Sequence, residues 1–352
     1  MTKNQVILQD LQQIAETPVE WSRFSGKTVL ISGANGFLPA YMVETLLFLL
    51  EKGIISNTRI LALVRNIAKA KERFKDYQDN ENLEFIVQDV CQPLATDYRI
   101  DYVIHAASQA SPKYYGTDPV GTLSANILGT INLLRLAVKN PVESFLFFSS
   151  SEVYGNLDDN EIPVKETDFG YLDPAKVRSC YAESKRMGET ICISFLHQFG
   201  VPVKIVRPFH IYGPGLAPDD GRVHADFIAD IVNNRNITMK SDGLAMRSFC
   251  YIADATAAFF MTLLDGNKGE AYNVGNPGCE ISIIRLAETL VDLFPEKRLQ
   301  VISTKDPDNG YLKSPVSRNS PDLSRINKLG WKPVTGINDG FYRTVKSYEQ
   351  II

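Results

Sequence analysis

The sequence has no excess of basic residues and no long apolar run. Its 37 Lys and Arg are set against 41 Asp and Glu, a formal charge of −4, so we expect a small partner and not a nucleic acid, whose phosphates require a basic surface. A membrane helix needs about 20 apolar residues, but the most apolar run, Tyr41 to Leu50, is broken by Glu44. Asp10 and Glu16 interrupt the place where a signal peptide would have its apolar centre. We therefore expect no membrane association and a cytoplasmic location.

Paired cysteine motifs are also absent. The chain has five cysteines, an odd number, and no C-x-x-C pair, so a zinc site or a disulfide framework is not expected. We predict reduced thiols and no bound metal. There is no internal repeat and no low-complexity tract, and with 44% hydrophobic and 22% charged residues the 352-residue chain has the composition of a globular protein of one large or two unequal domains.

What the sequence does contain is an alternation of short apolar runs and helical patterns. Residues 40–52 repeat apolar side chains at close to 3.6 positions and end at Gly53, which predicts a helix. Alternating strands and helices favour a parallel sheet covered on both faces, in the doubly wound α/β arrangement. The predicted strands are 27–33, 59–64, 83–87, 102–105 and 144–149, and strands at 203–206 and 271–274 are expected to join the same sheet.

A glycine-rich turn lies between the first strand and the first helix. It reads Gly33-Ala-Asn-Gly36-Phe-Leu-Pro39, at the place where such a turn brings a pyrophosphate onto a helix N-terminus. The spacing resembles that of the extended short-chain dehydrogenase/reductase family, with Pro39 in the position of the third glycine. We place Pro39 at the first helical position, where proline costs no hydrogen bond. The residues expected to contact NAD or NADP from this turn are Gly33, Asn35, Gly36, Phe37 and Leu38.

The residues at the end of the second strand do not decide whether the cofactor is NAD or NADP. An acidic residue normally binds the adenosine ribose there, but the sequence has Arg65. Arg65 either faces a 2′-phosphate or stacks on adenine. By resemblance to the family, Asp89 and Val90 contact the adenine, and the loop after the fourth strand lies on the nicotinamide side. That loop contributes Ala106, Ala107 and Ser108.

Tyr181 and Lys185 are four residues apart, on one face of a helix predicted to begin near Ser179. A nearby cation favours phenolate, so Lys185 is expected to lower the pKa of Tyr181 and make it a general base for a hydroxyl. Ser149 and Ser150 end the fifth strand, at the carboxyl edge of the sheet, where a serine hydroxyl can share the substrate proton. The three motifs together predict an alcohol–ketone site.

Glu152 follows these serines and indicates chemistry beyond hydride transfer. Simple alcohol–ketone exchange needs no carboxylate. Glu152 can remove a C5 proton of a sugar, or return one to C5 after a bond is cleaved. The alternative is a salt bridge at the rim of the site.

The resemblance narrows when the remaining motifs are included, and it spans about residues 27–348. The motifs are Ala110-Ser-Pro-Lys-Tyr-Tyr115, Val177-Arg-Ser-Cys-Tyr181, Asp219-Asp-Gly-Arg222-Val223, Arg247-Ser-Phe-Cys-Tyr251, Arg318-Asn-Ser-Pro-Asp322 and Leu329-Gly-Trp-Lys-Pro333. They are similar to the UDP-glucuronate decarboxylase branch. The resemblance implies a homodimer, catalytic roles for Ser150, Glu152, Tyr181 and Lys185, and cofactor contacts from Ser149, Tyr181 and Lys185. It also implies sugar-nucleotide contacts from Tyr115, Ser151, Arg222, Arg247 and Arg318, in agreement with the fit of guanidinium groups to a diphosphate.

One further position departs from the branch. His210 stands where the family usually has an asparagine near the substrate diphosphate. It is structural, a substrate contact or a proton donor, and we favour the contact. Together with the missing ribose acid, His210 leaves open which hexose and which nucleotide are bound.

The predicted activity is decarboxylation of a nucleotide uronate through transient C4 oxidation by bound NAD. The alternatives are a nucleotide-hexose 4,6-dehydratase, in which Ser151 stands where many such enzymes have an aspartate, then a 4-epimerase, and a non-catalytic NAD(P)-binding sensor. We divide the chain into an N-terminal extension (1–25), a dinucleotide-binding Rossmann domain (26–207) and a smaller substrate-binding lobe (208–352), of which about 250–290 returns to the first domain. Residues 1–25 form a clasp, a dimer arm or a disordered tail.

Overall fold

The centre of the molecule is a seven-stranded sheet with the strand order β10-β6-β5-β4-β1-β2-β3, in which every neighbouring pair is parallel. The computed structural model describes residues 2–218, 220–239, 241–303 and 316–349. The doubly wound prediction is confirmed, and both late strands join the sheet. The strands are β1 (Thr28–Ser32), β2 (Arg59–Val64), β3 (Leu83–Val87), β4 (Tyr102–His105), β5 (Ser144–Phe148), β6 (Val203–Pro208) and β10 (Ala271–Val274).

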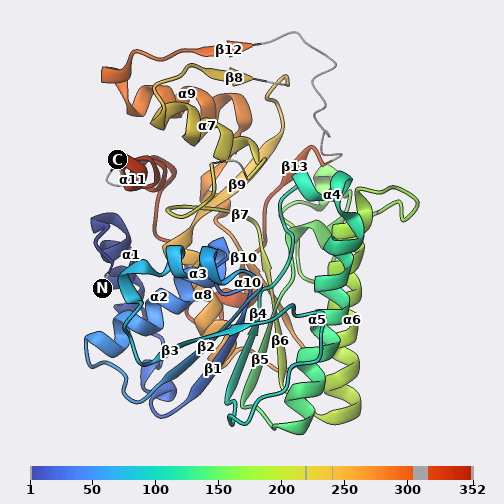
Figure 1. Ribbon diagram of the computed structural model, residues 1–352. Coiled ribbons are helices and arrows are strands. Elements are labelled where there is room, and N and C mark those ends of the chain that lie inside the picture. Colours follow the sequence, from blue (N-terminus) through green and yellow to red (C-terminus); the bar gives the residue numbers. More distant parts are fainter. Residues whose placement is uncertain (1, 219, 240, 304–315, 350–352) are drawn as a thin grey trace.

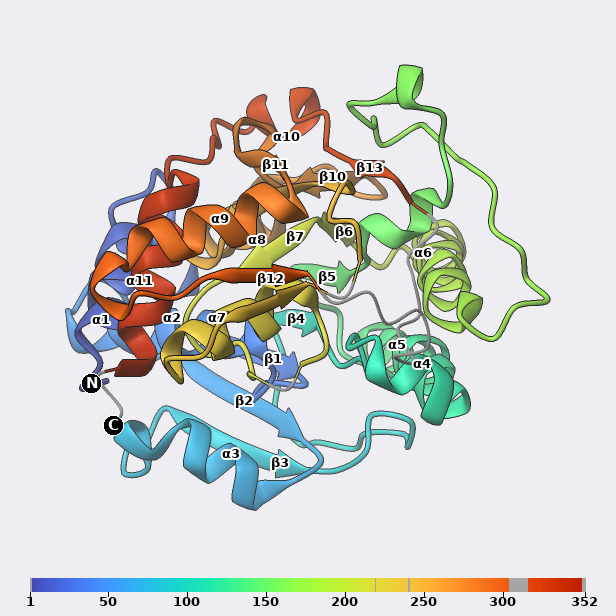
Figure 2. The same ribbon diagram turned by 90° about the horizontal axis from the view of Figure 1, so that it is seen from above.

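Helices cover both faces of this sheet, as Figures 1 and 2 show. Successive strand residues point to opposite faces, so Leu30 packs under α5 and α6 while Val29 and Ile31 pack under α2 and α8. The helix α8 is buried on all sides, which explains why it is apolar all round. The bounds are α2 (Phe37–Glu51), α3 (Ile67–Arg73), α4 (Lys113–Thr117), α5 (Pro119–Lys139), α6 (Ser179–Phe199) and α8 (Ile252–Asp265).

The helix α2 begins three residues before the predicted start. Gly36 is its N-cap, and the first intrahelical bond runs from the Ala40 amide to the Gly36 carbonyl at 3.0 Å. Pro39 is therefore the third helical residue and not the first, which corrects the prediction. The correction does not disturb the helix, because the amide of the third position has no intrahelical partner either.

A smaller lobe lies over the carboxyl edge of the large sheet (Figure 1). Its main sheet has the order β11-β9-β13, with β7 paired to β9, and a second sheet pairs β8 with β12. Within the predicted returning segment, α8 and β10 belong to the first lobe, whereas β11 and α9 belong to the second. The bounds are β7 (His210–Tyr212), α7 (Val223–Val232), β8 (Ile237–Met239), β9 (Met246–Tyr251), β11 (Glu280–Ser282), α9 (Ile283–Leu293), β12 (Val301–Ser303), β13 (Arg318–Asn319), α10 (Ser324–Asn327) and α11 (Ile337–Glu349).

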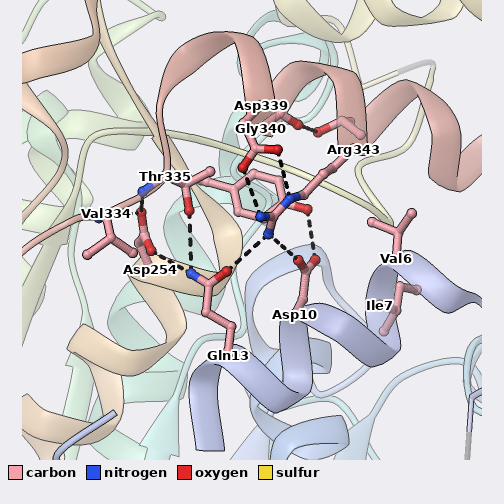
Figure 3. Close-up of polar contacts among 12 residues, drawn as sticks. Val6, Ile7, Asp10, Gln13, Asp254, Val334, Thr335, Asp339, Gly340 and Arg343 are labelled. Carbon is pink, nitrogen blue, oxygen red and sulfur yellow. Dashed lines mark hydrogen bonds and ion pairs between the residues drawn. The ribbon is translucent and has the colours of Figure 1, made fainter. Parts of the chain in front are cut away.

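The N-terminal helix α1 (Gln5–Ala15) packs against α2, α8 and α11, so the first and the last helix of the described chain lie side by side (Figure 2). Asp10 of α1 has no exposed surface and accepts hydrogen bonds from the phenols of Tyr41 at 2.9 Å and Tyr251 at 2.8 Å. The guanidinium of Arg343, on α11, lies 3.5 Å from the same carboxylate (Figure 3). Of the three alternatives for the N-terminal residues, this packing is that of a clasp. We use this name for α1 together with its contacts to α2, α8 and α11.

A second carboxylate completes the clasp. Asp254 on α8 accepts hydrogen bonds from the amides of Val334 at 3.0 Å and Thr335 at 2.8 Å, and from the side chain of Gln13 at 3.0 Å (Figure 3). The N-terminal helix is thus bonded to the first lobe and to the C-terminal segment by buried polar groups.

All five cysteines are free; Cys192, Cys250 and Cys279 are buried, and Cys91 and Cys180 are half-buried. Among the residues that the structure describes, no helix combines the length and the apolar character required to cross a bilayer.

Candidate active site

The glycine turn after β1 makes a close approach that only glycine allows. Gly33 has φ +66°, and a Cβ at this position would lie 2.7 Å from the Cα of Ala107 in the loop after β4. The Gly33 carbonyl accepts a hydrogen bond from the Gly36 amide at 2.7 Å. The amides of Phe37 and Leu38, at the start of α2, have no intrahelical partner, which makes this turn suited to the pyrophosphate of a dinucleotide.

The loop after β4 is held against the same turn by a residue that the sequence analysis missed. The hydroxyl oxygen of Ser32, at the end of β1, accepts hydrogen bonds from the amides of Ala106 and Ala107, both at 3.2 Å. The hydroxyl of the next residue, Ser108, is buried without a hydrogen-bond partner in the described part of the chain. A buried hydroxyl normally has a partner, so a bound nicotinamide group fits this position.

Arg65, Asp89 and Val90, which were predicted to lie near the adenine, lie at the same edge of the sheet, because they follow the parallel strands β2 and β3. The Asp89 carboxylate accepts a hydrogen bond from the Cys91 amide at 2.8 Å, and Arg65 is exposed. These residues, with Gly33, Asn35, Gly36, Phe37 and Ala107, lie outside the large cavity described next.

A cavity of about 1010 Å³ separates the carboxyl edge of the sheet from the smaller lobe. Its walls come from the loops after β4 and β5, the first turns of α6, β7, α7 and β9. Thirteen of the predicted site residues meet there: Leu38, Ala106, Ser108, Tyr115, Ser149, Ser150, Ser151, Glu152, Tyr181, Lys185, His210, Arg222 and Arg247.

Ser150, Tyr181 and Lys185 are brought together, but their electrostatics differ from the prediction. Burial raises the pKa of Tyr181 to about 12, and a hydrogen bond with Ser150 and the charge of Arg222 oppose this rise. Burial lowers the pKa of Lys185 to about 7. The Lys185 ammonium donates to the Phe148 carbonyl at 2.6 Å and lies 5.8 Å from the centre of the Tyr181 ring. In the protein alone, Ser150 and Arg222 are thus the main groups that favour phenolate, and Lys185 is not.

Glu152 forms an ion pair with Arg178, whose guanidinium nitrogens lie 3.1 and 3.4 Å from the two carboxylate oxygens. The predicted alternative of a salt bridge is therefore present, although both residues also line the cavity. The ring of Tyr115 stacks on that of Tyr181 with 5.0 Å between centres. Arg178 lies 6.0 Å from the Tyr115 ring. The sequence analysis missed Arg178, although its place three residues before Tyr181 put it at the start of α6.

Arg318 is the exception among the predicted substrate residues. Its guanidinium binds Glu280 at 2.5 and 3.0 Å, and it lines a side cavity of about 40 Å³ that also touches Ser151 and Glu152. Arg318 does not line the large cavity. Sequence reasoning could not find the competing partner, because Glu280 is 38 residues away.

Ser149 lines the cavity, but its hydroxyl donates to Glu189 at 2.5 Å. Glu189 also forms an ion pair with buried Arg207 at 2.6 Å, and Arg207 donates to the Tyr154 phenol at 3.0 Å. This network anchors the loop that carries Ser150 and Glu152 to α6 and β6. Glu189 and Arg207 were missed because their pairing joins α6 to β6 across 18 residues of sequence, although Glu189 lies only one turn after Lys185 on α6.

A doubly wound parallel sheet with a glycine turn at a helix N-terminus is the architecture of dinucleotide-binding proteins. The family model described as "NAD dependent epimerase/dehydratase family" matches residues 29–275. The chain belongs to this family. It is 34% identical over 328 residues to UDP-glucuronic acid decarboxylase 6 of Arabidopsis thaliana, with 92% of this chain and 90% of the relative covered. It is 31% identical to UDP-glucuronic acid decarboxylase 1 of Xenopus tropicalis, with 92% and 72% covered.

Solved structures show the same fold. The dTDP-glucose 4,6-dehydratase DesIV of Streptomyces venezuelae, solved with NAD and TYD bound, is 23% identical with a TM-score of 0.77 and 92% and 97% of the two chains covered. The UDP-glucose 4-epimerase of Thermotoga maritima, solved with UDP-glucose, is also 23% identical with a TM-score of 0.77, covering 92% and 99%. The predicted family, fold and NAD dependence are confirmed.

Proposed function

We propose that the protein is an NAD-dependent nucleotide-uronate decarboxylase acting on UDP-glucuronate. The observation that carries this proposal is the meeting of Ser150, Tyr181 and Glu152 in one cavity next to the glycine turn. The relatives over 92% of the chain are UDP-glucuronic acid decarboxylases, which supports the choice of substrate.

Tyr181 is hydrogen-bonded with Ser150. We assign to Tyr181 the removal of the proton from the C4 hydroxyl. Bound NAD would supply reversible hydride exchange at C4, so that the reaction has no net redox change. With C4 as a ketone, the C6 carboxylate belongs to a β-keto acid. The C5–C6 bond then breaks, carbon dioxide leaves, and the electron pair passes to the C4 oxygen as an enolate.

We assign Glu152 and Arg178 to the part of the sugar that contains C5 and the C6 carboxylate. After carbon dioxide leaves, C5 needs a proton. Glu152 is paired with Arg178 as a carboxylate and stands two residues from Ser150 in the cavity wall, so we assign it to accept a proton from solvent and pass it to C5. The Arg178 guanidinium offsets the charge of Glu152, which would otherwise repel a uronate carboxylate.

The test is to incubate purified protein with UDP-glucuronate, UDP-glucose and dTDP-glucose. Carbon dioxide and a pentose nucleotide from the uronate are expected. A 4-keto-6-deoxy product would identify a dehydratase instead, an inverted C4 an epimerase, and an inert protein that binds NAD a sensor. Tyr181→Phe should lower turnover by roughly 10²- to 10⁴-fold, whereas Tyr171→Phe, at an exposed position (70%), is the matched control.

We also propose a homodimer built on α5 and α6. These two helices pack together and expose apolar side chains on their outer surface, at 37% or more of their area. Leu128→Glu should shift the molar mass measured by light scattering from a dimer to a monomer, and Ile54→Glu, at an exposed site away from these helices, should not. The outward apolar residues are Val120, Leu128, Val138, Met187, Ile193 and Phe199. The predicted cytoplasmic location is in keeping with the five free thiols.

A further inference from the structure

The clasp lies at a place where the chain passes from one lobe to the other. The strand β9 of the smaller lobe ends at Tyr251, and α8, which covers the large sheet, begins at the next residue, Ile252. The phenol of Tyr251 donates to the carboxylate of Asp10 at 2.8 Å. Lobes turn relative to each other at such junctions between elements. The helix α1 is therefore bonded to a junction about which the smaller lobe would turn.

On the side of the first lobe, α1 is bonded to the helices that lie next to the dinucleotide turn. Asp10 accepts a hydrogen bond from Tyr41 of α2 at 2.9 Å, and α2 begins at this glycine turn. The side-chain amide of Gln13 donates to Asp254 of α8 at 3.0 Å. These bonds fix α1 relative to the large sheet.

On its other side, α1 is bonded to α11 near both of its ends. The side-chain amide of Asn4, the N-cap of α1, donates to the Ser347 carbonyl at 2.8 Å. The guanidinium of Arg343 donates to the side-chain oxygen of Gln13 at 3.0 Å and lies 3.5 Å from the Asp10 carboxylate (Figure 3). The position of α11 is thus set by directional bonds from α1.

Towards the smaller lobe, α11 packs on the strands that form one wall of the large cavity. The ring of Phe341 stacks on that of Tyr212 of β7, with 3.9 Å between centres, and meets Phe249 of β9 edge-on at 5.7 Å. The same two strands carry His210 and Arg247 in the cavity wall. The helix α11 also packs against α7, whose first turn lines the same wall. A shift of α11 would therefore move the substrate side of the cavity.

The bonds of Asp10 are all made at one arrangement of these elements. Its carboxylate has no exposed surface, and its partners come from α2, from the end of β9 and from α11. Apolar contacts have no preferred direction, whereas a broken bond to a buried polar group leaves that group without a partner, at a high cost in free energy. Rotation of the smaller lobe is therefore opposed at Asp10.

Other bonds join the lobes at the cavity itself. The guanidinium of Arg222 lies 3.5 Å from the Ala110 carbonyl, and the Ser111 hydroxyl donates to the Asp220 carbonyl. Arg222 and Ala110 line the cavity, so a ligand that fills it competes with their contact. The clasp residues do not line the cavity, and a ligand leaves their bonds in place.

We propose that the clasp sets the angle between the two lobes, and that Asn4, Asp10 and Arg343 are positioning residues for the sugar-nucleotide side of the cavity. When the clasp is broken, part of the protein has the smaller lobe turned away. The apparent dissociation constant for a ligand of that lobe then rises in inverse proportion to the fraction that stays in place. The inference rests on the proposed function, since it takes this ligand to be a nucleoside diphosphate sugar. The matched family model ends before α11 and begins after α1, as it covers residues 29–275.

The test is the calorimetric titration of the wild type and of Arg343→Met with UDP and, separately, with NAD. This substitution removes the bonds from α11 to Asp10 and Gln13 and keeps the bond between Tyr41 and Asp10. The dissociation constant for UDP should rise roughly 5- to 10-fold, which corresponds to a competent fraction of about 0.1–0.2. The dissociation constant for NAD should stay the same, because the glycine turn and α2 belong to the first lobe.

Two matched variants accompany this comparison. Asn4→Asp keeps an oxygen that caps α1 but cannot donate to the Ser347 carbonyl, so it should raise the dissociation constant for UDP as well, and it serves if Arg343→Met fails to fold. Arg235→Met is the control. It removes an exposed ion pair with Asp230, at 3.0 Å within the smaller lobe, and should change neither constant.

A purely structural role would give a different result. A protein that is partly unfolded binds UDP with a lower stoichiometry and an unchanged dissociation constant, whereas a turned lobe gives the full stoichiometry and a raised constant. With UDP-glucuronate, KM should rise by the same factor while kcat stays within about twofold, because saturating substrate holds the lobe in place. The reacting groups of Ser150, Glu152 and Tyr181 all belong to the first lobe.

An unchanged dissociation constant for UDP in both clasp variants, a lower stoichiometry alone, or an equal rise for NAD would each overturn the inference. Unchanged UDP binding in variants of an active decarboxylase would reject the role of the clasp alone. Weaker UDP binding by Arg343→Met, in a protein that converts no sugar nucleotide, would reject the decarboxylase alone. If the wild type binds dTDP and not UDP, the proposed substrate is rejected, and the same comparison with dTDP tests the clasp.

Discussion

The buried carboxyl of Asp10 makes the stability of the clasp depend on pH in a calculable way. Burial raises its pKa from 3.8 to about 7, against the opposing hydrogen bonds of Tyr251 and Tyr41 and the charge of Arg343. The unfolded chain loses this proton near the ordinary pKa, and the folded chain does so only near pH 7. Between these values only the unfolded state is charged, so the free energy of unfolding falls as the pH rises, and above pH 7 the loss is constant.

The size of the effect follows from the pKa difference. At about 1.4 kcal/mol per pKa unit, the loss above pH 7 is about 4 kcal/mol, of which roughly 2 kcal/mol is already present at pH 5. Asp10→Asn removes the ionisation. Relative to Asp10→Asn, the wild type should therefore lose about 2–3 kcal/mol between pH 5 and pH 8.

Urea unfolding followed by tryptophan fluorescence measures this difference. Both tryptophans report on the clasp: Trp21 donates to the carbonyl of Ala15 at 3.0 Å, and Trp331 to that of Asp254 at 2.9 Å. The buried histidines titrate in both proteins, so their effects cancel in the comparison.

Asp339→Asn is the matched control. Asp339 pairs with the same Arg343 at 2.8 Å but is 50% exposed, so its loss should change the stability by less than about 1 kcal/mol at every pH. If Asp10→Asn kept the full wild-type fall between pH 5 and pH 8, the assignment of a proton to buried Asp10 would be refuted.

Three further changes test the site. Gly33→Ala should destabilise the fold by about 2–5 kcal/mol, because its Cβ meets backbone 2.7 Å away at a positive φ, and weaken NAD binding, while Gly53→Ala, with a similar φ and open space, should cost about 1 kcal/mol in thermal unfolding. Glu152→Gln should lower the formation of the pentose nucleotide by roughly 10²- to 10⁴-fold, and unchanged formation would contradict its role in delivering a proton to C5. Tyr154→Phe should cost about 1–3 kcal/mol in urea unfolding, because its phenol is bonded to Asn273 and Arg207 in the buried network; no loss would mean that the network relaxes.

Much of the fold could be predicted because strand and helix signals are local. The predicted strands 59–64, 83–87 and 102–105 have the observed bounds, and α6 begins at Ser179 as expected. The start of α2 was placed too late, since the sequence does not say which residue of a glycine turn becomes the cap. The division of the chain at residue 207 and the roles of the site residues stay predictions.

The same holds for the site: what depends on neighbouring residues in the sequence could be predicted, and what depends on residues from other elements could not. Motif order and strand ends were enough to bring Ser150, Glu152 and Tyr181 to one cavity, and the resemblance to the family added Arg247. The pairing of Arg318 with Glu280, and the use of the Ser149 hydroxyl by Glu189, depend on residues from other elements.

By itself, the order of residues along the chain determined which chemical groups stand at the carboxyl edge of the sheet, because parallel strands carry their last side chains to the same edge. Only the tertiary structure decided how those groups are charged. Ionisation depends on water being excluded by segments that are distant in sequence, and this is why Lys185 was expected as a cation but has a pKa of about 7, and why Asp10 has a pKa of about 7 as well.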